Sequence, residues 1–587
     1  MRHPAASASP SCLLLAAFTA AFTAVGCGSS DGGASASPAD PGPGPGLFDT
    51  GAVDAVDDGG RSDGARALDT GVHADGAGPD AGRVDAADGG ADGGAVADAP
   101  PVAVDPCGAS TGATVRVPAG GDLQAAIDAA KPGDTLLLAA GATFTGNFVL
   151  PDKGPDPRCI TLRSDAPDSA LPAPGTRLGP SSAALLPRIV AASVMPAIAT
   201  APGAHHYRLL ALELTVSPAT YNFVIVALGA GDETALSQLP HDLVLDRVYV
   251  HGDPRSGAKR GVALNSINSW IVDSTIADIK GEGQDTQAIA GFNGPGPFRI
   301  VDDELEAAGE NILFGGADPR IAGLVPSDIV IADNHLAKPL GWRVGDPGYV
   351  GTHWSVKNLF ELKNAQRVTL DHNVLENVWP DAQNGYAIVL TPRNQEGTCP
   401  WCVVQDVTIT HNVVRHAARA IGLLATDDTN PSLPEQRIVV RDNLFDDIGF
   451  SWGDGWFVTL ASAYVTFDHN TIVSSGNAAS WDSAPTEPGW VFTNNVVPHN
   501  EYGFHVDSGA RLEAIFPGLI FQHNVVPGGS AAELPAGTAN FFPATMADVG
   551  FRDAATRDYR LSATSAYRAA GTDGRDPGAD FDALPAH

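Results

Sequence analysis

The sequence predicts an all-β protein, a right-handed parallel β-helix with a short capping helix at its N-terminal end. One motif recurs along the chain: alternating apolar residues, a polar pair that commonly ends in Asn, and two or three further apolar residues. A unit of about 25–30 residues built from short strands cannot bury its own core face, so successive units must stack. Asn-Gly turns between strands are largely missing, which disfavours the hairpins of a sandwich or propeller.

The repeat is marked by an Asn near the end of each motif. These residues are Asn334, Asn373, Asn412, Asn443, Asn470, Asn495 and Asn524, and in earlier units Arg247, Ser274 and Asp303 take the same place. Three short strands with their turns fill one unit, and longer units carry loops. Asn tolerates the left-handed backbone of a tight corner, and its amide can bond to the Asn above and below. We therefore expect a stacked ladder of Asn side chains.

A helix is expected ahead of the repeats, over residues 123–130. Asp122 is a good N-cap, and an apolar stripe follows at helical spacing from Leu123 to Ile127. Pro132 and Gly133 then end the helix before the next apolar run. A short helix in this place would cover the open end of the first sheet.

The first 27 residues are typical of a bacterial lipoprotein signal peptide. Arg2 precedes an uncharged apolar stretch of 15 residues, which is too short to span a membrane, and small residues lead into Cys27. Residues 28–105 follow as an Asp-, Gly- and Ala-rich segment that cannot offset its chain entropy by burial, so we expect a disordered tether. Residues 106–587 form the folded domain. We expect an exported protein, anchored at the cell envelope through a lipid on Cys27; the alternative is an ordinary secretory signal in which Cys27 has no such role.

The charge balance excludes several classes of partner. The chain of 587 residues carries 68 Asp and Glu against 35 Lys and Arg, a formal net charge of −33. No basic stripe is present, so we expect no nucleic-acid partner and no docking on anionic lipid by charge. The periods of collagen and coiled coils are absent, and no phosphate-binding loop or serine nucleophile motif appears. We expect a monomer without an organic cofactor.

A resemblance supports this fold. The segment LQAAIDAAKPGDTLLLAAGATFTG, the Asn-bearing turns and the C-terminal DYRLSATSAYRAAGTDGRDPGADFDA resemble the pectin-lyase-like superfamily of right-handed parallel β-helix proteins over about residues 110–587. That superfamily includes polysaccharide lyases, glycoside hydrolases, esterases, epimerases and non-enzymatic surface proteins. The resemblance therefore implies the fold, while the activity has to be argued from individual residues.

The candidate site lies on a second strand between successive Asn turns. Long loops precede and follow this strand, so its outward side chains would form the floor of a groove suited to a polymer. Alternation in LFELKN points Phe360 and Leu362 inward and leaves Glu361 and Lys363 outward. The candidate catalytic residues are Lys363, Arg393, Glu361, Lys280 and Glu310, and Asp427 and Asp428 are candidate ligands of a metal ion such as Ca²⁺.

Two chemistries fit these residues. Elimination from a uronic acid needs a cation, Arg or Ca²⁺, beside the substrate carboxylate and a base that removes the C5 proton. Hydrolysis needs two carboxyl groups on either side of the glycosidic bond, and Glu361 with Glu310 or Asp427 could supply them. Outward charges on a sheet also occur as a solvated face with no catalytic role.

Aromatic residues gather in the same region. Eight of the nine Trp lie between Trp342 and Trp490, and exposed rings can stack on sugars, whereas buried rings would pack as lids over the solenoid. The candidate substrate-binding residues are Trp354, Trp379, Tyr386, Trp401 and Gln287.

Four of the six cysteines lie in the expected folded domain, beyond Cys12 and Cys27 of the signal peptide. An exported protein can form disulfides, and Cys107–Cys159 with Cys399–Cys402 is the simplest of three pairings. The Cys399–Cys402 spacing matches redox motifs, but no helix follows to activate a thiolate, so closure of a loop is the favoured role.

The combined prediction is a tethered, carbohydrate-active enzyme that cleaves or modifies a polysaccharide, with a lyase slightly favoured over a hydrolase. The alternative is a non-catalytic surface protein that binds glycan or mediates adhesion through the same groove.

Overall fold

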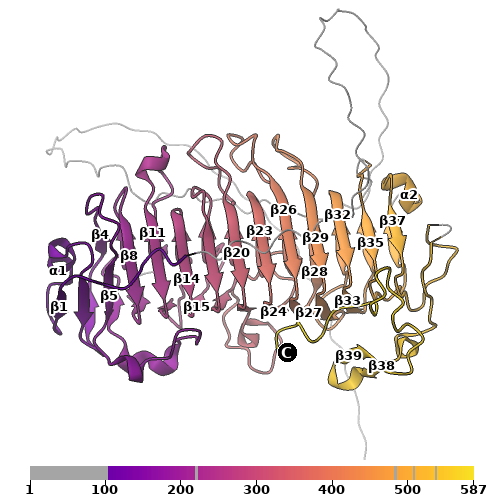
Figure 1. Ribbon diagram of the computed structural model, residues 1–587, viewed down its shortest axis with the longest axis horizontal. Coiled ribbons are helices and arrows are strands. Elements are labelled where there is room, and N and C mark those ends of the chain that lie inside the picture. Colours follow the sequence, from indigo (N-terminus) through magenta and orange to yellow (C-terminus); the bar gives the residue numbers. More distant parts are fainter. Residues whose placement is uncertain (1–103, 218–222, 482–485, 507–508, 536–537, 587) are drawn as a thin grey trace, which may run out of the picture. The chain divides into compact units, whose positions relative to one another are not determined.

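Three long parallel sheets wind around one core, as the repeats predict (Figure 1). The computed structural model describes residues 104–217, 223–481, 486–506, 509–535 and 538–586, which all belong to one compact unit. Most turns of the coil contribute one strand to each sheet, and every pairing within the three sheets is parallel. The prediction of a right-handed parallel β-helix is confirmed.

Sheet A holds 14 strands among the described residues. In sheet order they are β1 (Thr114–Val117), β2 (Thr135–Leu138), β5 (Ile160–Ser164), β8 (His205–Leu210), β11 (His241–Asp246), β14 (Ile267–Val272), β17 (Phe298–Val301), β20 (Ser327–Ala332), β23 (Ala365–Asp371), β26 (Val404–Thr410), β29 (Gln436–Arg441), β32 (Ala463–Asp468), β35 (Val491–Thr493) and β37 (Ile520–Gln522).

Sheet B follows sheet A in each turn. Its strands are β3 (Thr143–Thr145), β6 (Arg188–Val190), β9 (Glu213–Thr215), β12 (Tyr249–His251), β15 (Thr275–Ile279), β18 (Glu304–Ala307), β21 (His335–Ala337), β24 (Val374–Val378), β27 (Val413–Ala417), β30 (Leu444–Ile448) and β33 (Thr471–Ser474).

Sheet C follows sheet B. Its strands are the second strands that the sequence predicts between successive Asn turns. Its strands are β4 (Phe148–Leu150), β7 (Ile198–Thr200), β10 (Val224–Leu228), β13 (Arg260–Leu264), β16 (Gln287–Gly291), β19 (Glu310–Phe314), β22 (Phe360–Leu362), β25 (Tyr386–Leu390), β28 (Arg419–Leu423), β31 (Val458–Leu460), β34 (Ala479–Trp481) and β36 (Phe504–Val506). Loops 338–359 and 379–385 precede its strands, and loops 315–326 and 391–403 follow them.

The core is built from rows of like side chains stacked from turn to turn. One inward row of sheet C runs through Val262, Ile289, Ile312, Phe360, Ile388 and Ile421, which pair in register and are buried. Because successive strands bury matching positions, each such side chain contributes on the order of 1.5–3 kcal/mol through removal from water. The prediction that Phe360 and Leu362 point inward is confirmed.

Helix α1 (Leu123–Ala129) precedes the second strand, as predicted. Its N-cap Asp122 accepts a hydrogen bond from the Ala125 backbone N–H at 2.9 Å, and Leu123 and Ile127 are buried in the core. The apolar face of the helix therefore joins the start of the coil (Figure 1).

The other elements lie in loops and at the C-terminal end. They are α2 (Leu512–Ile515), the antiparallel pair β38 (Phe551–Asp553) and β39 (Asp558–Leu561), and short 3₁₀ helices η1 (Asp168–Ala170), η2 (Pro180–Leu185), η3 (Leu236–Gln238), η4 (Leu340–Trp342), η5 (Met546–Val549) and η6 (Ala554–Thr556). Disulfides join Cys107 to Cys159 and Cys399 to Cys402.

The Asn ladder lies at the corner between sheets A and B. The Asn412 side chain is fully buried; its Nδ2 donates to Asn443 Oδ1 at 3.0 Å, and its Oδ1 accepts from the backbone N–H and Nδ2 of Asn373. The same pattern links Asn334 to Asn524 through every intervening unit, and Asn540 adds a final rung that the sequence motif did not reveal. The ladder satisfies buried backbone donors that would otherwise be unpaired.

The left-handed residue at this corner is the one before each Asn, contrary to the expectation that Asn itself adopts that backbone. His372, His411 and Asp442 have φ of 55°, 53° and 54°. Arg247 has φ of 50° and is therefore the corner residue; the ladder position belongs to Val248, whose N–H donates to Ser274 Oγ at 3.0 Å. The assignment of Arg247 to the ladder was wrong by one position, whereas Ser274 and Asp303 do occupy ladder positions.

The expected signal peptide (residues 1–27, which end at Cys27) lies outside the described residues, and so do residues 28–103 of the expected tether (28–105). Among the residues that the structure describes, no helix has the length and apolar character needed to cross a bilayer.

Candidate active site on sheet C

The site begins with three polar residues that parallel pairing aligns on sheet C. Arg260, Gln287 and Glu310 open strands β13, β16 and β19, and the register pairs Arg260 with Gln287 and Gln287 with Glu310. Arg260 donates to Gln287 Oε1 at 2.8 and 3.2 Å, and Gln287 Nε2 donates to Glu310 Oε2 at 2.9 Å. A hydrogen-bonded chain therefore leads from a guanidinium to a buried carboxyl.

Burial favours the protonated form of Glu310. Its side chain is fully buried, and among the described residues no donor reaches Oε1 within hydrogen-bonding distance. Burial, together with the nearby charge of Asp285, raises the pKa of Glu310 to about 8. Asp285 is half-exposed, and although burial opposes it, Lys357 and a hydrogen bond with Glu310 lower the pKa of Asp285 to about 2. The two carboxyls therefore titrate as a coupled pair, in which burial favours the proton on Glu310.

Lys357 reaches this pair from the long loop between β21 and β22. Its Nζ lies 2.7 Å from Asp285 Oδ1 and 3.9 Å from Glu310 Oε1. Burial alone would lower the pKa of Lys357, but these two carboxyls outweigh it and raise the pKa, so the ammonium is charged. Lys259 has the opposite character: burial, Arg260 and Lys357 lower its pKa, although Asp285 opposes the shift.

Glu361 and Lys363 complete the group from β22 and the residue just beyond it. Lys363 Nζ lies 3.3 Å from Glu361 Oε1, and Asn358 Nδ2 donates to Glu361 Oε2 at 3.1 Å. Burial opposes the charge of Lys363, but the carboxyls of Glu361, Glu310 and Asp285 raise its pKa. We call the residues Lys259, Arg260, Asp285, Gln287, Glu310, Lys357, Glu361 and Lys363 the Glu310 cluster.

The outer face of sheet C around Glu361 is apolar, contrary to the expected charged floor. Glu361 pairs with Leu313 on one side and Val389 on the other, and all three side chains are buried. The alternation places Glu361 on the outer face as predicted, but the covering loops and Lys363 remove it from solvent. The carboxylate is therefore held in a low-dielectric setting, where its pairing with Lys363 is strengthened.

Tyr386 forms a second polar group on the same face. Its hydroxyl accepts a hydrogen bond from Arg419 at 2.8 Å and lies 2.5 Å from Thr459 Oγ1, while Arg419 pairs with Asp454. The Tyr386 ring lies over Gly422, where an added Cβ would sit 3.2–3.4 Å from the ring. Glycine at this position therefore lets the ring approach the sheet.

Lys280 belongs to a different, buried group. Its Nζ lies 2.6 Å from Asp278 Oδ1 and 5.2 and 5.3 Å from the ring centres of Trp342 and Trp354. Trp354 and Trp379 pack together in the same small hydrophobic cluster and are 4% and 6% exposed. These rings are packed as lids, and their faces are not open in this structure.

Arg393 also forms a separate group with the predicted metal ligands. Its guanidinium lies 3.5 Å from Asp427 Oδ1 and pairs directly with Asp428. Asp427 also accepts backbone N–H bonds from Asn394, Thr429 and Asn430, which lower its pKa although burial opposes them. A cation at this pair would have to displace Arg393, so the Ca²⁺ assignment stays a prediction.

Four of the predicted site residues meet in the Glu310 cluster: Lys363, Glu361, Glu310 and Gln287. Trp401 has a different partner, since its Nε1 donates to the Leu324 carbonyl at 3.1 Å. Sequence reasoning missed Asp285 and Lys357, which come from loops and lie 72 residues apart. The one available signal was the alignment of polar residues at the start of consecutive sheet C strands.

Comparisons with known proteins yield structural matches only. No family model matches the chain, and no curated protein is similar in sequence. An alginate lyase from Paenibacillus sp. str. FPU-7 matches with 14% identity over 56% of this chain and 99% of its own, at a TM-score of 0.30. A mannuronic acid specific polysaccharide family 6 lyase from human gut microbiota matches with 11% identity, 73% and 91% coverage, and a TM-score of 0.43. A pectate lyase matches with 14% identity over 82% of this chain and 98% of its own, at a TM-score of 0.35.

The strand topology gives the chain the fold of a right-handed parallel β-helix. The candidate site on this fold is the Glu310 cluster on the outer face of sheet C.

Proposed function

We propose that the protein is a carbohydrate-active enzyme that cleaves an acidic polysaccharide at the Glu310 cluster by elimination. The observation that carries this proposal is the gathering of Lys259, Arg260, Lys357 and Lys363 on one face of a chain whose net charge is −33. These cations are half-buried rather than fully covered. A local excess of positive charge on an acidic protein favours a substrate that carries carboxylates.

The cluster supplies the groups that elimination requires. Lys357 and Lys363 have raised pKa values and stay charged, so they can neutralise a uronate carboxylate and acidify the adjacent C5 proton. Lys259 has a lowered pKa and is the cation best suited to lose its proton and act as the base. Glu310 lies beneath them and positions this charge pattern through Gln287 and Lys357.

Hydrolysis is the second candidate, and one observation favours it. Glu310 is protonated at neutral pH, and Glu361 on the neighbouring strand is paired with Lys363. A glycoside hydrolase uses one carboxyl as the general acid and a second as the base or nucleophile, and these two residues could supply the pair. Glu310 would have to become accessible to a glycosidic oxygen for this role.

The deciding experiment incubates the purified protein with a panel of uronate-containing and neutral polysaccharides. We expect unsaturated uronate ends from an acidic polymer, and Lys363→Ala and Lys357→Ala should each lower kcat/KM by about 10²-fold or more. Lys131→Ala, an exposed lysine beyond helix α1, is the matched control and should change kcat/KM by less than about twofold.

Other outcomes identify the alternatives. Saturated reducing ends that disappear in Glu310→Gln would favour hydrolysis. Binding of a polymer without any product would favour the non-catalytic glycan-binding protein. Equal activity with and without EGTA would argue against a Ca²⁺ ion at Asp427 and Asp428.

We also propose that the protein works as a monomer at the bacterial cell envelope, anchored by a lipid on Cys27. The apolar stretch before Cys27 and the acidic, Gly-rich tether after it support this proposal. Cys27→Ser should abolish incorporation of labelled palmitate and move the protein from the membrane fraction to the soluble fraction. An unchanged membrane fraction in that variant would contradict the proposal.

A further inference from the structure

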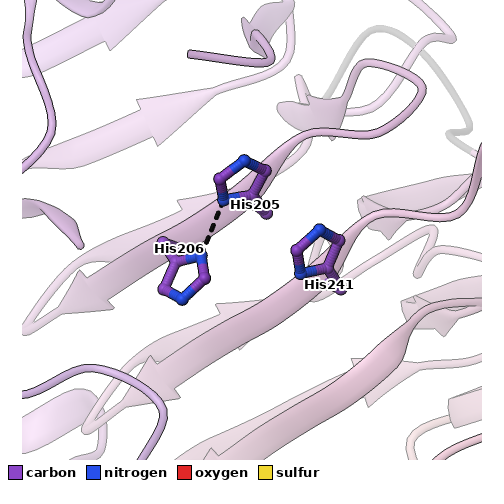
Figure 2. A group of neighbouring side chains, drawn as sticks. All are labelled: His205, His206 and His241. Atoms are coloured by element: carbon purple, nitrogen blue, oxygen red, sulfur yellow. Dashed lines mark hydrogen bonds between the residues drawn. The ribbon is translucent and has the colours of Figure 1, made fainter. Parts of the chain in front are cut away.

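Three histidines converge on sheet A, away from the residues assigned above. His205 and His206 are consecutive in β8, and His241 opens the adjacent strand β11, as Figure 2 shows. The Nδ1 atoms of His205 and His206 lie 2.6 Å apart, and the rings of His205 and His241 stack with centroids 4.5 Å apart. One ring nitrogen from each of the three side chains lies within 4.8 Å of the other two.

The backbone explains why neighbouring residues point to one side. Strand register pairs His205 with His241, so the next residues, His206 and Asp242, also occupy matching positions. Both have left-handed backbones, with φ of 55° and 53°. This conformation interrupts the alternation of a regular strand, so that His205 and His206 turn toward each other while Tyr207 enters the core.

Carboxylates surround the three imidazoles. Asp242 Oδ2 lies 2.6 Å from His241 Nδ1 and 3.7 Å from His206 Nε2, and Asp152 Oδ1 lies 3.7 Å from His205 Nε2. In protein metal sites, a carboxylate commonly orients each histidine through the ring nitrogen that does not bind the ion. The contact of His241 Nδ1 with Asp242 has that arrangement, since it lies within hydrogen-bonding distance. For His205 and His206, the Nδ1 atoms face each other, and the Nε2 atoms lie on the side of the carboxylates at 3.7 Å.

An open depression of about 600 Å³ lies beside the group. His205 and His241 line it together with Asp152, Gly154, Gly203 and Leu239, among others. The three histidine side chains are 10%, 14% and 36% exposed, so they are partly shielded yet can be reached from solvent. A small ion can therefore enter without disturbing the core.

We propose that His205, His206 and His241 form a binding site for a divalent transition metal ion of the zinc type. Three imidazoles are a common zinc ligand set, and a fourth position open to solvent is typical of sites that bind water or a small ligand. Tetrahedral coordination with Zn–N distances of about 2.0–2.1 Å separates ligand nitrogens by about 3.3 Å. Small side-chain rotations would bring the observed 2.6 Å contact and the wider separations to that value.

The choice of ion follows from the donor chemistry. Neutral imidazoles suit Zn²⁺, Cu²⁺ and Ni²⁺, whereas Ca²⁺ and Mg²⁺ prefer oxygen ligands. The site is independent of the proposed enzymatic activity, because none of its residues belongs to the Glu310 cluster.

The test measures metal directly. The purified full-length protein is stripped with a chelator, mixed with excess Zn²⁺ and passed through gel filtration, and zinc is then quantified per chain. We expect about one equivalent to be retained at this site, and Co²⁺ in its place should give the intense visible absorption of a four-coordinate ion. His206→Ala and the milder His241→Gln should each weaken Zn²⁺ affinity by about 10²-fold or more, with circular dichroism confirming that they fold.

Two control variants decide the location. His353→Ala alters an exposed histidine that pairs with Asp381, and it should leave Zn²⁺ affinity unchanged. His411→Ala alters the other group with ligand spacing among the described residues, Asp371, His372 and His411, and should also retain the ion. Absence of retained zinc, loss of it only in His411→Ala, or the weak spectrum of six-coordinate Co²⁺ in the unmutated protein would each overturn the proposal.

Discussion

The protonated state of Glu310 can be tested by replacing it with Gln, which has nearly the same shape and stays neutral at every pH. The amide introduced by Glu310→Gln could still accept from Gln287 and donate to Asp285, so the hydrogen bonds of the protonated acid are preserved. In the unmutated protein the folded-state pKa of about 8 exceeds the ordinary value of 4.5. Between those two values the unfolded chain ionises while the folded protein keeps its proton, so rising pH favours unfolding.

The magnitude follows from linkage. Each pH unit between 4.5 and 8 lowers the free energy of unfolding by about 1.4 kcal/mol, so the total loss has an upper limit of about 5 kcal/mol. Coupling to Asp285, whose own pKa is lowered, reduces the expected loss to about 2–3 kcal/mol. For a folded part of about 480 residues the unfolding entropy is about 1 kcal/mol per kelvin, so the effect amounts to about 2–3 °C. Glu310→Gln should therefore match the unmutated protein at pH 5 and unfold about 2–3 °C higher at pH 8.5, as measured by differential scanning calorimetry.

A matched control is Glu376→Gln on sheet B. Hydrogen bonds from His335 lower the pKa of Glu376 to about 2 despite burial, and Arg415 adds to the effect. Its stabilising effect is present above pH 4.5 and is lost as pH falls toward 2, so this variant should be destabilised at pH 7. If the difference between Glu310→Gln and the unmutated protein were constant from pH 5 to 9, Glu310 would be ionised and the reasoning would be refuted.

Three further predictions concern the ladder, a sheet B histidine and the Tyr386 ring. Asn412→Ala leaves buried donors unpaired and should lower the free energy of unfolding, measured by denaturant titration, by about 2–4 kcal/mol. Asn540→Ala, at the end of the ladder, should lower it by about 1 kcal/mol. Equal losses in the two variants would contradict a role of the ladder in stability. Hydrogen bonds to Glu304 and Glu376 raise the pKa of His335 to about 9, although burial opposes the shift. The contribution of His335 to the stability of the folded protein should therefore be complete below about pH 6.5 and should be lost as the pH rises through 9. His335→Gln should remove this pH dependence from the unfolding midpoint. Gly422→Val should displace the Tyr386 ring and lower kcat/KM about tenfold on any polymer that the protein cleaves, whereas an unchanged rate would place Tyr386 outside the site.

The fold was predictable because its signals are local. Alternating apolar residues specify each strand, and an Asn at one corner of most turns marks the repeat, so the three sheets and their stacking follow from spacing alone. The helix from Leu123 was predictable for the same reason, since Asp122 caps it directly. Three turns lack the Asn marker: the assignments of Ser274 and Asp303 to the ladder position are correct, and that of Arg247 is wrong by one residue, because Val248 occupies that position.

The candidate site could be predicted only in part. Alternation placed Glu361 on the outer face, but nothing in its neighbourhood in the sequence shows that Leu313 and Val389 lie beside it and that loops bury it. Lys363 lies two residues after Glu361 and pairs with it, whereas Arg393 pairs with Asp428.

The sequence by itself determined the solenoid and its repeat, because these depend on patterns within a single turn. The tertiary structure alone decided which charges meet. Lys357 reaches Asp285 across 72 residues, and the proton on Glu310 depends on burial and on a carboxylate from another loop. His205 and His241 likewise become neighbours only through the pairing of β8 and β11. Electrostatic effects of this kind depend on distance and solvent exclusion, which the order of residues along the chain does not specify.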